Sequence, residues 1–215
     1  MWPPWLTPTW CCTWTASNPR STRRWTRSEG TAFDAAAAAR LERRDPHFWL
    51  DPTRLAAVGE AFARQLGVDR ADSADTFRNN AEALARSLNA LDRKFETGLS
   101  SCENRNLVTS HAAFGYLARR YRLTPVAITG LSPEEEAAPG EIAEITEFVK
   151  DERVTTIYFE TLVSPAIAET IARETGAEAE VLDPIEGLTD DAEGDDYLEV
   201  MRANLATLVE GQRCR

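Results

Sequence analysis

The chain has 215 residues, of which 43% are hydrophobic and 27% charged, a length and mixture typical of one large globular domain or two small ones. The formal net charge of -11 argues against nucleic acid as a partner, because phosphate binding requires a basic surface. No run of apolar residues approaches the roughly 20 that are needed to cross a bilayer.

The first thirty residues differ from the rest of the chain. They hold five of the six tryptophans together with Cys11 and Cys12, and they show neither helical nor strand periodicity. They also lack the basic start and apolar stretch of a secretory signal. An aromatic interaction arm, a vicinal cysteine pair or a disordered segment would each fit this composition. When residues 1–26 are back-translated with mostly GC-rich codons and shifted by two nucleotides, however, they encode an apolar strand-like run followed by a turn and a helix start. We therefore expect residues 1–30 to be frameshifted and disordered.

Helical patterns dominate the next seventy residues. An alanine-rich, helix-prone stretch at 34–43 is followed by Asp45–Pro52, a short apolar core between two Asp-Pro breaks. Thr53–Leu66 has one apolar stripe, and Gly67 is expected to end that helix. Ala74–Leu99 repeats apolar residues at steps of three and four and predicts a helix of about 39 Å. Such a helix suits either a connection between two lobes or packing on a single domain.

After Cys102 the predicted elements alternate between strands and helices. Strands are expected at residues 107–109, 125–129, 155–159 and 180–182, and helices at residues 112–121, 139–151, 165–175 and 194–211. This alternation predicts an α/β fold with a four-stranded parallel sheet flanked by helices. Ligands of such sheets bind at the carboxyl ends of the strands.

Only two histidines occur in the chain, His47 and His111. Histidines in a globular protein are most often ordinary polar residues. Here, however, His111, Glu160 and Asp183 each follow a predicted strand, so all three are expected at one rim of one sheet. Imidazole and carboxylate groups gathered there are suited to coordinate a cation.

Other motifs are weak. The sequence has no glycine-rich phosphate loop and no Gly-x-Ser-x-Gly elbow. Cys102 and Cys214 lie at the two ends of the alternating region, where they are either two free thiols or a disulfide. A disulfide would close a loop of about 100 residues, add roughly 4–5 kcal/mol of stability and indicate an oxidising compartment.

Several motifs carry a family resemblance. Asp45–Pro52 (DPHFWLDP) and Thr109–Leu117 (TSHAAFGYL) resemble two segments of the zinc/manganese solute-binding proteins of ABC transporters. Ile157–Glu160, Gly194–Tyr197 and Asn204-Leu205 match the same family. The resemblance covers residues 31–215 in order.

The resemblance implies two αβ lobes joined by one long helix. Residues 31–73 then correspond to a remnant of the N-terminal lobe, residues 74–99 to the linker helix, and residues 100–215 to a complete C-terminal αβ lobe. The first metal ligand of the family, a histidine, would lie upstream in the missing part. Such a truncated chain is expected to bind metal more weakly than an intact relative and to aggregate.

The resemblance also implies a ligand set. His47 matches the second ligand, His111 the third and Asp183 the fourth, while Glu160 matches a residue that lines the site. Imidazole ligands favour zinc. Manganese is expected less, because it prefers carboxylate and water ligands. The implied function is capture of zinc outside the membrane by a monomeric periplasmic protein or lipoprotein, followed by delivery to an ABC permease without chemistry.

Two other hypotheses remain open from the residues alone. One is a hydrolytic metalloenzyme that uses an open zinc position with Glu160 as general base. The other is a non-functional gene remnant.

Overall fold

The computed structural model divides the chain into two compact units, unit 1 (Met1–Asn89) and unit 2 (Ala90–Arg215). The boundary falls inside the long helix predicted at residues 74–99. The structure describes residues 10–13, 31–42, 45–132, 135, 137–160, 164–187 and 193–215.

Unit 1 begins with two short parallel strands, β1 (Trp10–Thr13) and β2 (Thr31–Asp34). Strand β1 lies inside residues 1–30, where the sequence pattern indicates no strand, because pairing with a distant partner leaves no local periodicity to detect. The rest of that segment, including any test of a shifted frame, lies outside the described residues. Helix α2 (Ala35–Ala39) follows and is capped by the Asp34 carboxylate.

The helices of unit 1 follow the sequence pattern with one difference. A 3-10 turn, η1 (Phe48–Leu50), leads into α3 (Pro52–Asp69), whose first N–H groups are capped by the Asp51 carboxylate. Gly67 does not end this helix as predicted. A Cβ atom at Gly67 would lie 3.3 Å from Ala74 Cβ. The glycine therefore permits a close approach of the next segment instead of breaking the helix.

Helix α4 (Ala74–Gly98) follows a short 3-10 turn, η2 (Ala71–Ser73), and contains 25 residues. Its bounds agree with the predicted helix to one residue. Its last turns belong to unit 2, where Leu91 and Phe95 are buried and the Phe95 ring stacks on Tyr121 at 5.0 Å. Among the described residues, no helix combines the length and apolarity that a membrane crossing requires.

Unit 2 is built on a four-stranded parallel sheet in the order β4-β3-β5-β6, which confirms the predicted α/β architecture. The strands are β3 (Asn106–Thr109), β4 (Thr124–Ala127), β5 (Thr156–Phe159) and β6 (Glu178–Val181). The helices are the 3-10 turn η3 (Ala112–Phe114), α5 (Gly115–Arg120), α6 (Pro139–Asp151), α7 (Ala166–Thr175) and α8 (Tyr197–Gly211). Each lies where the sequence predicts a strand or a helix.

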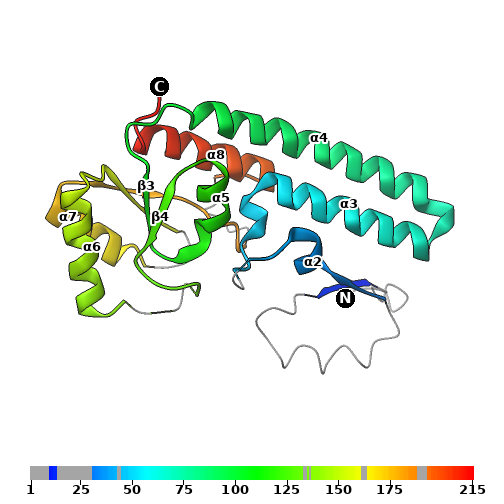
Figure 1. Cartoon of the computed structure of the whole chain (residues 1–215), viewed down its shortest axis with the longest axis horizontal. Coiled ribbons are helices and arrows are strands. Elements are labelled where there is room, and N and C mark those ends of the chain that lie inside the picture. Colours follow the sequence, from blue (N-terminus) through cyan, green and yellow to red (C-terminus); the bar gives the residue numbers. More distant parts are fainter. Residues whose placement is uncertain are drawn as a thin grey trace. The chain divides into compact units, whose positions relative to one another are not determined.

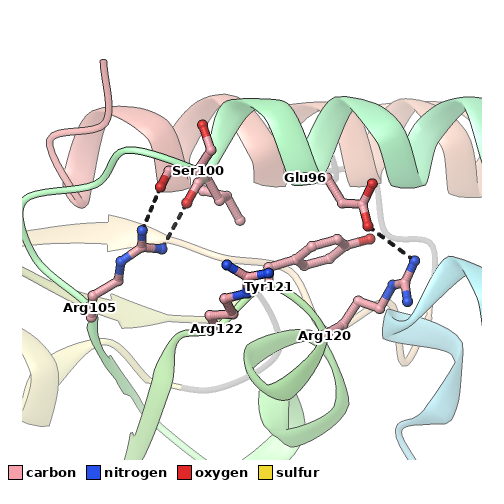
Figure 2. A pocket seen from close by; sticks show the side chains of 7 residues that line it. Glu96, Ser100, Arg105, Arg120, Tyr121 and Arg122 are labelled. Atoms are coloured by element: carbon pink, nitrogen blue, oxygen red, sulfur yellow. Dashed lines mark hydrogen bonds and ion pairs between the residues drawn. The ribbon is translucent and has the colours of Figure 1, made fainter.

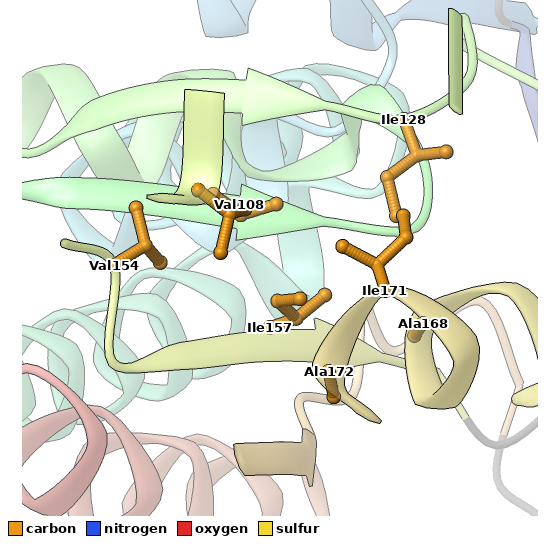
Figure 3. Packing of buried hydrophobic residues seen from close by; sticks show 8 residues of the cluster. Val108, Ile128, Val154, Ile157, Ala168, Ile171 and Ala172 are labelled. Carbon is orange, nitrogen blue, oxygen red and sulfur yellow. The ribbon is translucent and has the colours of Figure 1, made fainter. Parts of the chain in front are cut away.

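Helices cover both faces of the sheet. On one face, Val108 and Ile157 of the central strands pack against Ile171 of α7 and Val149 of α6 (Figures 1 and 3). On the other face, Tyr158 approaches Gly211 of α8, because successive side chains of a strand point to opposite faces. The central strands are thus buried on both sides, which explains why they appear in the sequence as short apolar runs.

A disulfide between Cys102 and Cys214 closes unit 2, which decides between the two alternatives that the sequence leaves for these cysteines. The two cysteines form a β-bridge, and the neighbouring Asn104 N–H donates to the Gln212 carbonyl at 3.2 Å. The start of the sheet region and the end of α8 are therefore tied together by a covalent bond and by backbone hydrogen bonds.

Candidate metal centre

Unit 2 brings three predicted site residues to one edge of its sheet. His111 follows β3, Glu160 follows β5 and Asp183 follows β6, each within two residues of the end of its strand. Their exposed fractions are only 1%, 2% and 6%. Ionisable side chains are buried this deeply only when they are paired or coordinate a metal.

The imidazole of His111 is held by Glu160. Its Nδ1 is hydrogen-bonded to Oε1 of Glu160, and because an ionised carboxylate only accepts, Nδ1 carries the proton. The Ser110 hydroxyl donates to the same oxygen at 2.8 Å. The other ring nitrogen, Nε2, lies 3.6 Å from Oε1 of Glu186, and in a neutral imidazole with the proton on Nδ1 it would bear the lone pair. Metal-ligating histidines are typically held in this way by a carboxylate on the far nitrogen.

The electrostatics of this edge favour a positive charge. Burial alone lowers the pKa of His111, but the hydrogen bond and charge of Glu160, together with Glu186, raise it above its usual 6.5. Burial raises the pKa of Asp183, and the charges of Glu160 and Glu186 raise it further, against a lowering by the hydrogen bond from Ile185 N–H. Asp183 therefore lies within electrostatic range of both glutamates. A divalent cation at this edge would offset the repulsion between these carboxylates.

The backbone of Asp183 is fixed by Asn204 of α8. The Asp183 N–H donates to Oδ1 of Asn204 at 2.9 Å, and the Asn204 Nδ2 donates to the Asp183 carbonyl at 2.7 Å. The Asp183 carboxylate in turn accepts the Ile185 N–H at 2.7 Å. Asn204 is itself buried, so the residue after β6 is held at a defined position.

His47 belongs to unit 1 and has a similar local environment. It is 1% exposed, and its Nδ1 lies 2.8 Å from Oδ1 of Asp45, which also accepts the His47 N–H at 3.0 Å. The Trp49 ring meets the imidazole edge-on at 5.4 Å. A carboxylate thus holds Nδ1 of each of the two histidines.

Sequence reasoning missed some contacts at these histidines. Glu186 was not singled out, because it lies in an irregular segment after Ile185, whose backbone is left-handed (φ 57°). Asp45 was read only as part of a turn, although a carboxylate two residues before a buried histidine is a usable signal. The bond from Ser110 to Glu160 spans fifty positions and leaves no local trace in the sequence.

The set of donor atoms suits a divalent cation that is intermediate between hard and soft, such as zinc. Imidazole nitrogen and carboxylate oxygen are both zinc ligands, whereas carboxylate and water alone are more typical of manganese. The described residues at this edge present one imidazole, from His111, among three carboxylates, from Glu160, Asp183 and Glu186. This arrangement can bind a divalent cation.

Comparison with known proteins identifies a family. Residues 15–211 match the model of ZnuA, described as the periplasmic component A of a zinc-uptake complex. The chain is 43% identical over 166 residues to the zinc-binding lipoprotein AdcA of Streptococcus pneumoniae serotype 4, covering 76% of this chain and 33% of that protein. It is 34% identical to the high-affinity zinc uptake system protein ZnuA of Bacillus subtilis, of which it covers 52%. The chain thus spans between a third and a half of these relatives.

Solved structures agree with the sequence matches. The laminin-binding protein Lbp of Streptococcus pyogenes matches with a TM-score of 0.84 and 31% identity, over 95% of this chain and 82% of that one. The Zn(II)-bound ZnuA-like domain of Streptococcus pneumoniae AdcA matches with a TM-score of 0.75 and 36% identity, over 90% and 74%.

Proposed function

Because the chain belongs to the family of the zinc-uptake complex component A, we propose that it is the solute-binding component of an ABC importer. In this proposal zinc is the cargo, captured outside the cytoplasm and delivered to a membrane permease. The names of the relatives support it, since AdcA is a zinc-binding lipoprotein and ZnuA belongs to a high-affinity zinc uptake system.

The zinc ligands that we propose are His47, His111 and Asp183. The observation that carries the proposal is the pairing of Nδ1 of buried His111 with Glu160, which directs the lone pair of Nε2 away from that carboxylate. The equivalent pairing of His47 with Asp45 supports the second histidine. Two imidazoles and one carboxylate favour zinc over manganese.

Glu160 has a positioning role in this proposal. Its Oε1 accepts hydrogen bonds from both His111 and Ser110, so this carboxylate fixes the imidazole tautomer and orientation. This contact accounts for the burial of Glu160 without assigning it the general-base role of a hydrolase.

We also propose that the protein works outside the cytoplasm as a monomer. The Cys102–Cys214 disulfide supports an oxidising location, because such bonds are rare in reducing compartments. The lipoprotein name of AdcA and the periplasmic description of the family support the same location.

Zinc titration of the full chain tests the function. We expect saturable zinc binding by calorimetry, a loss of about 100-fold or more in affinity for His111→Ala, and a loss of about 10–100-fold for Glu160→Gln. Glu169→Gln is the matched control, because Glu169 is a surface residue of α7 that pairs with Arg173. Manganese is expected to bind more weakly than zinc. Unchanged zinc affinity in His111→Ala would contradict the proposed site.

A further inference from the structure

A polar cavity of about 350 Å³ lies at the opposite end of the unit 2 sheet from the candidate metal centre. Arg105 comes directly before β3, and Arg122 comes two residues before β4, the neighbouring strand. The amino ends of these two strands therefore bring both arginines to one place. The cavity lining consists of Glu96, Leu99, Ser100, Arg105, Arg120, Tyr121 and Arg122.

Two of the three arginines are held in place by the protein. Arg105 donates from Nη1 to the Leu99 carbonyl and from Nη2 to the Ser100 carbonyl, each at 2.7 Å. Arg120 donates to both carboxylate oxygens of Asp92, at 2.9 and 2.7 Å. A guanidinium has five N–H donors in a rigid fork, so Arg105 keeps donors beyond the two used here.

The charges in the cavity do not cancel. Arg120 is balanced by Asp92 and by Glu96, whose Oε1 lies 3.4 Å from its Nη2. Arg105 is bonded to neutral carbonyls, and within the described part of the chain no carboxylate pairs with it or with Arg122. Figure 2 shows Arg122 between Arg105 and Arg120, beside the Tyr121 ring. The cavity therefore carries an excess of positive charge in a chain whose net charge is -11.

We propose that this cavity binds an oxyanion of the phosphate type. The planar fork of arginine matches phosphate oxygens in a bidentate manner, and pre-oriented guanidinium groups lose little freedom on binding. The volume lies at the low end of small-molecule sites, which suits a small charged group rather than a large apolar ligand. The site is separate from the proposed zinc site, because it lies at the amino ends of β3 and β4, whereas His111 follows the carboxyl end of β3.

Titration with inorganic phosphate at constant ionic strength tests the proposal on the full chain. We expect saturable binding by calorimetry, weakened about tenfold by Arg122→Gln, because a bond between charged groups is worth more than a neutral one. Arg122→Glu should abolish binding. Arg122 is exposed, so neither variant should disturb folding.

The matched control is Arg173→Gln, which removes an exposed arginine of α7 outside the cavity and should bind phosphate as the parent does. Zinc affinity should be the same in all these variants. A negative result for phosphate binding is therefore distinguishable from a negative result for the proposed zinc site. Absence of saturable phosphate binding, or equal binding by the parent and Arg122→Glu, would overturn the proposal.

A second titration distinguishes the source of the phosphate group. Vesicles of phosphatidylcholine with and without phosphatidylglycerol are added to the parent and to Arg122→Gln. Vesicle binding that requires both phosphatidylglycerol and Arg122 supports a lipid headgroup as the ligand. Phosphate binding that requires Arg122, without vesicle binding, supports a free oxyanion.

Discussion

The protonation of His111 couples the candidate zinc site to pH. In the zinc-free protein Glu160 and Glu186 raise the pKa of His111, so the folded state holds the imidazole proton more tightly than the unfolded state does. The stability gained from this pairing is fully present below about pH 6.5 and is lost as the pH rises through the folded pKa. A neutral imidazole is needed to bind zinc, so proton and zinc compete for Nε2.

We therefore expect zinc affinity to fall as the pH is lowered through the raised pKa of His111, with proton release on binding below that pKa, where the free imidazole is protonated. Calorimetric titration between about pH 5.5 and 8 in two buffers of different ionisation enthalpy measures both quantities. Glu160→Gln removes the charge that raises the pKa, so its profile should shift to lower pH. A zinc affinity that is the same from pH 5.5 to 8 would count against His111 as a ligand.

At the scale of the element, two helices of unit 2 end in the same left-handed conformation with different residues. After α6 the residue is Arg153 (φ 52°), and after α7 it is Gly176 (φ 79°). The Val154 N–H donates back to the Val149 carbonyl at 3.0 Å, and the Gly176 N–H to the Ala172 carbonyl at 2.8 Å. Left-handed backbone costs a residue with a Cβ roughly 1–2 kcal/mol, whereas glycine adopts it freely.

We expect Gly176→Ala to lower the free energy of unfolding by about 1 kcal/mol and Arg153→Gly to raise it by about 0.5 kcal/mol. Nothing lies within 4 Å of a Cβ built on Gly176, so the first effect comes from backbone conformation alone. Gly140→Ala, in the open first turn of α6, is the matched control and should be stabilising. Urea unfolding followed by circular dichroism measures all three. The left-handed explanation fails if both alanine variants change stability in the same direction.

Some strands of this protein could be predicted from the sequence and others could not. The strands Asn106–Thr109 and Thr156–Phe159 were identified because strands buried on both faces are short apolar runs between helices. The parallel order then placed His111 and Glu160 at one edge. Strands β1 and β2 were missed because they are not short apolar runs between helices and each depends on a partner some twenty positions away. Glu186 was missed because its place depends on the irregular backbone at Ile185, which no periodic pattern describes.

At the scale of the whole molecule, charge is distributed unevenly between the two ends of the unit 2 sheet. The carboxyl ends of the strands bring Glu160, Asp183 and Glu186 to the same end of the sheet as His111. The amino ends gather the arginines of the cavity, of which Arg105 and Arg122 have no carboxylate partner in the described chain. One sheet thus carries the proposed cation site at one end and the proposed anion site at the other, so the two proposals depend on separate residues.

The Cys102–Cys214 disulfide spans 112 positions and encloses nearly all of unit 2, including every strand of its sheet. Closing a loop of this length restricts the unfolded chain, and the chain-entropy model assigns such a bond about 4–5 kcal/mol. Measured values are commonly smaller, so we expect the double variant Cys102→Ser/Cys214→Ser to lose about 2–4 kcal/mol of unfolding free energy. Backbone hydrogen bonds such as that from Asn104 N–H to the Gln212 carbonyl should keep the native contact between the two ends.

Urea unfolding of the parent and the double variant, each with and without reductant, measures this contribution. Reductant should destabilise the parent to the level of the variant and leave the variant unchanged. Zinc affinity of the folded double variant should match that of the parent, because the bridge lies at the opposite end of β3 from His111. Equal stability of the parent and the variant without reductant would show that the bond does not constrain the unfolded chain. Because disulfides form and persist in oxidising compartments, this contribution would be available to the protein at the location proposed outside the cytoplasm.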